Sequence, residues 1–304
     1  MKAARLADLL DDRVRRPGRI AELAEQRERP ASLVGQTGRL MLVAADHPAR
    51  GALRAGAEAM AMADRPELLR RLVVALDRPG VDGVLGTADI LEDLLLLGAL
   101  EGKVVIGSMN RGGLAGTSFE IDDRFTAYHA GAIERRGFQG GKMLLRIDPQ
   151  DAATAPTLVA CADAVNALAD RSLMAMVEPF ISHRVEGRVR NDLTAEAVIR
   201  SATVAAGLGW TSAHTWLKLP VVDSMDEVLA ATTLPVLLLG GEVGADQQAQ
   251  FTQWSKALDS PQVKGMVAGR SMLYPPGGDV AAVAALAVRA GGARLRGRFR
   301  ALGL

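Results

Sequence analysis

The chain has 304 residues, 49% of them hydrophobic, and a formal net charge of +1. This composition supports a full core, and the near-neutral charge gives no reason to expect nucleic acid or an anionic membrane as a partner. The single cysteine, Cys161, excludes an intrachain disulfide and indicates a reducing compartment. Because the amino-terminal segment lacks the apolar run of a signal peptide, and no apolar run approaches the roughly 20 residues that span a bilayer, we expect a cytoplasmic protein.

The first part of the chain, residues 1–38, is predicted to be an amino-terminal helical extension. Residues 4–14 and 19–28 place apolar side chains at helical spacing. This extension could cover the bottom of the domain that follows or reach a neighbouring subunit. Residues 39–304 are predicted to form a single catalytic domain, since no second domain is evident.

Eight apolar, strand-like runs alternate with helical segments in this domain. The strands are expected at residues 39–46, 83–89, 103–110, 142–148, 173–180, 214–221, 235–242 and 263–272. The helices are expected at residues 66–78, 90–101, 123–137, 155–171, 194–209, 224–233, 245–260 and 279–291. Continuously apolar strands separated by helices indicate a parallel sheet covered on both faces. Eight such units in about 250 residues are typical of a (β/α)8 TIM barrel, with a doubly wound open sheet as the competing arrangement.

The few lysines of the chain help to locate a site, because a TIM barrel keeps its active site at the carboxyl ends of the strands. Lys218 lies inside the apolar run "HTWLKLPV" (214–221), toward the end of the sixth predicted strand. Lys103 and Lys264 begin strands and are expected at the opposite end. Lys142 comes early in the fourth strand, so it either faces the interior or snorkels to water at the bottom.

Two carboxylates are predicted to share the barrel interior with Lys218. Asp46 closes the first strand and Glu178 lies near the end of the fifth, each on the inward face if the strands alternate as expected. One interpretation is a structural ion pair. The other is chemical: a lysine in a dry pocket has its pKa lowered from about 10.4, and its neutral amine can form a Schiff base with a carbonyl. A nearby carboxylate would then move protons.

Glycines follow the seventh and eighth predicted strands, where TIM barrels often bind phosphate. Gly240, Gly241 and Gly244 leave backbone N–H groups open to an anion, and Gly269 with Arg270 adds further donors and a cation. Ordinary tight turns are the alternative interpretation of these glycines.

The histidines offer a weaker possibility, a metal site. His47 and His183 follow the first and fifth strands and could bind a metal together with a carboxylate. A zinc site needs three convergent ligands, however, and no two histidines are spaced four residues apart as on a metal-binding helix. We therefore expect neither a metal nor another cofactor.

Six short motifs in order resemble a known group of enzymes. They cover roughly residues 39–290 and read "VAADHPARG", "GKMLLRIDP", "MVEPF", "TWLKLPV", "PVLLLGGE" and "VAGRSM". The set resembles the class I (Schiff-base) aldolases of the tagatose-bisphosphate and archaeal-type fructose-bisphosphate aldolase group, in the superfamily of deoxyribose-phosphate aldolase. It is most similar to an actinobacterial branch often associated with inositol catabolism.

The resemblance implies a role for each matching residue. Lys218 matches the imine-forming lysine, Lys142 the strand-four lysine that either makes the neighbouring amine easier to deprotonate or orients the substrate, and Glu178 and Asp46 the acid–base carboxylates. Gly269 and Arg270 match the "GR" that contacts phosphate. The implied enzyme is a carbon–carbon lyase acting on a phosphorylated keto sugar or sugar acid, with 2-deoxy-5-keto-gluconate 6-phosphate as the preferred substrate. Family habit also implies a homo-oligomer.

The chain departs from the family pattern at two places. The fourth strand ends in "RID" (146–148), where sugar-bisphosphate aldolases commonly have aromatic residues. Glu242 stands beside the glycines and would repel a phosphate unless it points away. These departures indicate a singly phosphorylated substrate.

The alternative functions are a metal-dependent lyase or sugar-phosphate isomerase on the same barrel, and a non-catalytic barrel that binds a sugar phosphate as a sensor.

Overall fold

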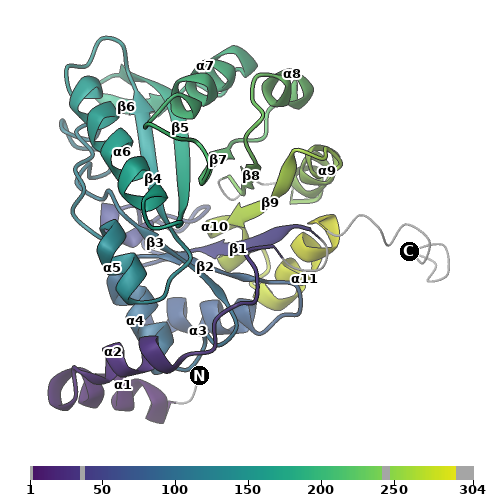
Figure 1. Cartoon of the computed structure of the whole chain (residues 1–304). Helices are drawn as coiled ribbons and strands as arrows, with labels where there is room; N and C mark the ends of the chain where they lie inside the picture. The colour runs from purple at the N-terminus through teal and green to yellow at the C-terminus, as the bar shows by residue number, and fades with distance from the viewer. Residues whose placement is uncertain (1–2, 35–37, 242–246, 292–304) are drawn as a thin grey trace, which may run out of the picture.

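The computed structural model describes residues 3–34, 38–241 and 247–291, and it confirms the predicted TIM barrel (Figure 1). Eight parallel strands follow one another around the barrel, and pairing of β1 with β9 and of β4 with β5 closes it. They are β1 (Leu40–Ala44), β2 (Gly83–Gly86), β3 (Val104–Ser108), β4 (Gly140–Ile147), β5 (Met174–Val185), β7 (Thr215–Leu219), β8 (Val236–Leu239) and β9 (Val263–Ala268). Closure excludes the doubly wound open sheet.

The helices surround this barrel. They are α3 (Arg65–Leu76), α4 (Ala88–Leu96), α5 (Ala130–Arg135), α6 (Thr154–Ala169), α7 (Ala195–Ala206), α8 (Met225–Ala230), α9 (Gln247–Leu258), α10 (Arg270–Leu273) and α11 (Val280–Gly291), with a short 3-10 turn at Pro48–Arg50. Within the described residues, no helix has the length and apolar character needed to cross a membrane.

Alternating side chains on the strands build two separate cores. One set, including Leu42, Ile106 and Met176, fills the barrel interior, while the next residues along the same strands, such as Val43 and Val177, pack against the helices. Strands buried on both faces explain the continuous apolar runs in the sequence.

The structure differs from the predicted elements in three places. A short strand, β6 (Arg188–Asn191), pairs antiparallel with the extended end of β5 and was not predicted. The last predicted strand ends at Ala268, and Arg270 begins helix α10 instead. Of the helix predicted at 123–137, only Ala130–Arg135 is helical, because the preceding loop is held against the barrel, where Asp123 is buried in an ion pair with Arg50.

The amino-terminal helices α1 (Ala3–Arg15) and α2 (Arg19–Gln26) pack beside α4 (Figure 1). Ile20 and Ala24 are buried there. Directly after α2, the buried guanidinium of Arg27 donates to the carbonyls of Leu100, Lys103 and Gly137 at 3.1, 3.0 and 2.9 Å. These carbonyls immediately precede β3 and β4, so the segment lies across the amino-terminal end of the barrel, opposite the carboxyl ends of the strands.

Candidate active site

A cavity of about 570 Å³ opens at the carboxyl ends of the barrel strands. All eight predicted site residues line it: Asp46, Lys142, Glu178, Lys218, Gly240, Gly241, Gly269 and Arg270. They come from β4, β5 and β7 and from the segments that follow β1, β8 and β9. The fold therefore brings together side chains that are separated by more than two hundred positions in the chain.

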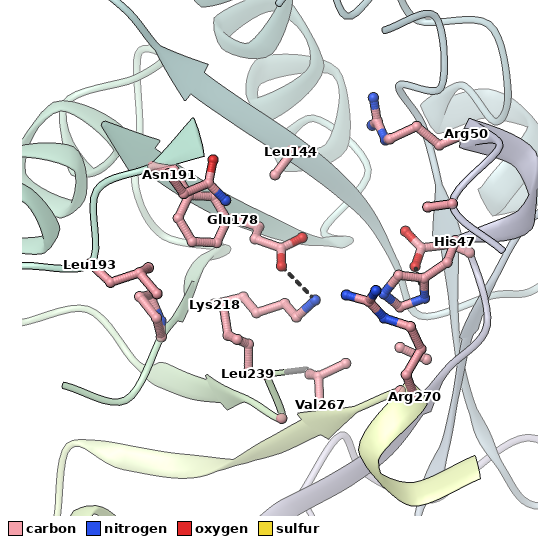
Figure 2. Close-up of a pocket in the computed structure, with 18 of the residues that line it drawn as sticks. His47, Arg50, Leu144, Glu178, Asn191, Leu193, Lys218, Leu239, Val267 and Arg270 are labelled. Atoms are coloured by element: carbon pink, nitrogen blue, oxygen red, sulfur yellow. Dashed lines mark hydrogen bonds and ion pairs between the residues drawn. The ribbon is translucent and has the colours of Figure 1, made fainter. Parts of the chain in front are cut away.

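Glu178 lies between the two interior lysines. Lys218 on β7 donates from Nζ to Oε1 of Glu178 at 2.8 Å, as Figure 2 shows, and Lys142 on β4 forms an ion pair with Oε2 of the same carboxylate. The register explains the contact: Met176 pairs with both Lys142 and Trp216, and Glu178 and Lys218 lie two residues further along their strands. Alternation thus puts all three polar side chains inside the barrel, with Lys142 one layer deeper.

Asp46 extends this charged chain on the other side of Lys142. Its Oδ2 lies 3.3 Å from Lys142 Nζ and 3.1 Å from Nη2 of Arg111, and Arg111 also donates from Nη1 to the Asp46 carbonyl at 2.5 Å. The hydroxyl of Ser108 donates to the same carboxylate at 3.3 Å. The result is an alternating chain, Arg111–Asp46–Lys142–Glu178–Lys218, whose side chains are all buried.

The charges in this chain decide its protonation. Burial alone would raise the pKa of Asp46, but Arg111 and Lys142 outweigh it and hold that pKa well below its ordinary value. Burial also raises the pKa of Glu178, but the charges of Lys142 and Lys218 outweigh this effect and lower it below its ordinary value. Burial lowers the pKa of Lys142, although Asp46 and Glu178 both favour its charged form. Both carboxylates are therefore ionised at neutral pH and can accept protons.

The position of Lys142 settles one of the open alternatives. Its side chain is only 3% exposed and ends on Asp46 and Glu178, so the idea that it snorkels to water is wrong. β4 (Gly140–Ile147) continues for five residues past Lys142, so this lysine lies within the barrel layers and not at the open lower end.

His47 was predicted only as a possible metal ligand, and the structure gives it a different setting. Burial lowers its pKa from 6.5 to about 3, so the imidazole is neutral at neutral pH. Its ring faces the side chain of Arg270 across the edge of the cavity (Figure 2). His183 is exposed on β5 and does not line the cavity. In the ranges that the structure describes, no group of three or more His, Cys, Asp or Glu residues is arranged to hold a metal.

The two glycine-bearing segments lie side by side at one edge of the cavity. Ser271 donates to the carbonyl of Gly240 at 3.1 Å, which ties the end of β8 to α10. A Cβ atom at Gly269 would lie 2.8 Å from the His47 ring and 3.0 Å from the Ala44 carbonyl, so a side chain would not fit without a shift. Gly241 has a φ of +65°, which favours glycine. Gly244 and Glu242 lie outside the described residues.

Two groups in the cavity were not predicted as functional. Arg111 comes three residues after β3, and only the folded loop shows that it turns back onto Asp46. Asn191 and Leu193, at the end of β6 and just after it, form part of the opposite wall (Figure 2). The sequence feature that could have indicated the hairpin is the Glu186–Gly187 pair. In the structure these two residues have positive φ angles of 50° and 75°, which are typical of a tight hairpin turn.

Comparison with known proteins identifies the family of this chain. A family model described as Cgl0159-like matches residues 38–288. The chain belongs to the Cgl0159-like family. The crystal structure of Cgl0159 from Corynebacterium glutamicum is 51% identical to it, covers 96% of this chain and 98% of its own, and superposes with a TM-score of 0.94. No functionally curated protein matches the chain.

The Cgl0159-like barrel is also similar in structure to class I aldolases. An archaeal fructose 1,6-bisphosphate aldolase superposes with a TM-score of 0.64 at 19% identity, covering 90% of this chain and 99% of its own. A Schiff-base-forming fructose-1,6-bisphosphate aldolase gives a TM-score of 0.63, also at 19% identity, with 89% and 98% covered. The expected likeness to these aldolases is confirmed at the level of the fold. The association with inositol catabolism stays a prediction.

Proposed function

We propose that the protein is a class I aldolase that uses Lys218 as its Schiff-base nucleophile. The observation that carries this proposal is the pair of buried lysines on either side of Glu178, with Lys218 at the cavity. A purely structural ion pair would need one cation for this carboxylate. The second ammonium group, that of Lys142, contacts the other oxygen of the same carboxylate, and a neighbouring like charge favours the neutral amine that attack on a carbonyl requires.

The proposed reaction uses the residues in sequence. The neutral amine of Lys218 adds to the ketone carbon and a carbinolamine forms. Its hydroxyl takes up one proton and leaves as water, which gives a protonated imine. A carboxylate then takes the proton of the hydroxyl two carbons from the imine carbon. The bond between the hydroxyl-bearing carbon and the carbon next to the imine carbon breaks. Its electron pair forms an enamine, and an aldehyde leaves. The same proton returns to the enamine carbon, and addition of water frees the ketone and the amine and releases the proton that imine formation took up.

The contacts suggest how the two carboxylates divide this work. Glu178 is hydrogen-bonded to Lys218 and is the nearer proton acceptor. Asp46 contacts Lys142 and Arg111, so it acts one step away from the reacting atoms. Lys142 helps to keep the neighbouring amine uncharged, and orienting the substrate is its alternative role.

The substrate we propose is a phosphorylated keto sugar or sugar acid. Arg270 projects into the cavity (Figure 2), and Gly240, Gly241 and Gly269 line the same cavity at the ends of β8 and β9, where backbone N–H groups could contact an anion. The more specific substrate, 2-deoxy-5-keto-gluconate 6-phosphate, is supported only by the sequence resemblance.

Borohydride trapping tests the proposal. The protein is incubated with a panel of keto sugar phosphates and with dihydroxyacetone phosphate, with and without borohydride, and its intact mass is measured. We expect a covalent adduct with at least one of them, lost in Lys218→Ala and kept in Lys256→Ala, which changes an exposed lysine on α9. Turnover that a chelator abolishes, with no adduct, would indicate a metal-dependent lyase or isomerase. Binding without turnover or adduct would indicate a sensor.

A further inference from the structure

The charged chain in the barrel ends at an arginine whose role the proposed reaction does not use. Arg111 makes two contacts with Asp46, at 3.1 Å to the carboxylate and 2.5 Å to the carbonyl, and donates from Nε to the Asn110 carbonyl at 2.8 Å. Its side chain is 7% exposed. An arginine held this way is fixed in place and keeps its proton at any physiological pH.

The chain from Arg111 to Lys218 has three cationic members and two carboxylates. The charged groups around it do not change this balance much. Arg50 is paired with Asp123 at 2.6 Å, Arg146 is paired with Glu120 at 3.0 Å, and His47 is neutral. Arg270 and Arg190 lie further out, at the edge of the cavity. The buried chain therefore carries an excess of one positive charge when both lysines are protonated and both carboxylates are ionised.

Excess charge in a buried site is costly, and release of one proton removes it. Arg111 does not release a proton, and the two carboxylates have none to release. This leaves Lys142 and Lys218, whose ammonium groups contact the two oxygens of Glu178, as the source of that proton.

We propose that Arg111 is a positioning residue that acts through Asp46 and Lys142 to keep one of the two lysines uncharged at neutral pH. This inference rests on the proposed function, in which Lys218 needs a neutral amine to form the imine. Without Arg111, two lysines face two carboxylates, the chain is balanced with both lysines charged, and nothing drives loss of a proton. Without the charge of Asp46, the excess grows to two, and the proton leaves more readily.

The test is the pH dependence of borohydride trapping by dihydroxyacetone phosphate, or by whichever ketose phosphate gives the parent adduct. We expect Arg111→Gln to raise the midpoint pH of adduct formation by about one unit or more, and Asp46→Asn to lower it. Arg111→Lys keeps a cation in place and is expected to remain near the parent. Arg124→Gln is the matched control, because Arg124 is an exposed arginine on the same loop, 78% exposed.

The outcomes separate this inference from the proposed function. If the parent protein forms an adduct but Arg111→Gln only lowers its yield equally at every pH, Arg111 is merely structural and the inference is wrong. Opposite shifts for Arg111→Gln and Asp46→Asn support it, because loss of packing in either variant would not move the midpoint in opposite directions. A parent protein that forms no adduct at any pH would overturn the proposed function, and the inference with it.

Discussion

Glu178 is the residue on which both interior lysines converge, and its charge should matter more than its shape. Glu178→Gln keeps the side chain nearly unchanged but removes the proton acceptor closest to Lys218. We expect kcat to fall by about 10²–10⁴-fold, the usual range for loss of a general acid–base group. Steady-state kinetics would check this against Glu196→Gln, an exposed glutamate on α7. A parent-like kcat in Glu178→Gln would be inconsistent with the assigned role.

His47 should make the protein less stable in mild acid. Its pKa is 6.5 in the unfolded chain and about 3 in the fold, because burial disfavours the charged ring. Between these values the unfolded chain binds a proton that the native protein does not, so stability falls as the pH decreases. We expect the free energy of unfolding in urea to decline from about pH 7 to about pH 5, and less steeply in His47→Gln. Equal slopes in the two proteins would contradict this.

At the scale of elements, the β5–β6 hairpin is an addition to the barrel that forms one wall of the cavity. Arg184 ties it down, donating to Asp151 Oδ2 at 2.9 and 2.8 Å and to the Ser118 carbonyl at 2.7 Å. We expect Arg184→Ala to raise KM several-fold with little change in kcat, because Asn191 and Leu193 lose their fixed position while the lysines do not. Arg188→Ala, on the same hairpin but exposed, is the control. A change in kcat without a change in KM would contradict the proposed role.

The barrel strands could be predicted from the sequence, whereas the hairpin and the loop after β3 could not. The eight barrel strands were predictable because burial on both faces makes them continuously apolar, and alternation then placed Lys218 and Glu178 inside. The hairpin was not, because β6 is short and exposed and three of its four residues are polar, so no apolar run marks it. Arg111 was not assigned a role, because its contact with Asp46 depends on the path of the loop after β3. Loop conformation, unlike a strand or helix, leaves no periodic pattern in the sequence.

At the scale of the whole molecule, the amino-terminal segment is predicted to stabilise the barrel from the end opposite the site. Arg27 is buried and donates to three backbone carbonyls, two in the connection before β3 and one in the connection before β4. Arg27→Ala leaves these carbonyls without their donor, so we expect a loss of about 2–4 kcal/mol in the free energy of unfolding. Urea denaturation would measure it, with Arg29→Ala, an exposed neighbour, as the control. Equal stability of the two variants would contradict this role for Arg27.

The same separation between the two ends predicts that Arg27→Ala leaves the chemistry intact. The charged chain is anchored on β1, β4, β5, β7 and the segment after β3, and none of its contacts involves the amino-terminal helices. We expect kcat in the folded fraction to match the parent. A large loss of kcat in fully folded Arg27→Ala would show that the two ends are coupled.

The proposed chemistry depends most on which lysine forms the covalent bond. Its most direct test is to digest the borohydride-trapped protein and identify the modified peptide by tandem mass spectrometry. We expect the reduced adduct on Lys218, in the peptide that contains "TWLKLPV". An adduct on Lys142 with Lys218 unmodified, or one distributed over exposed lysines such as Lys256, would contradict it.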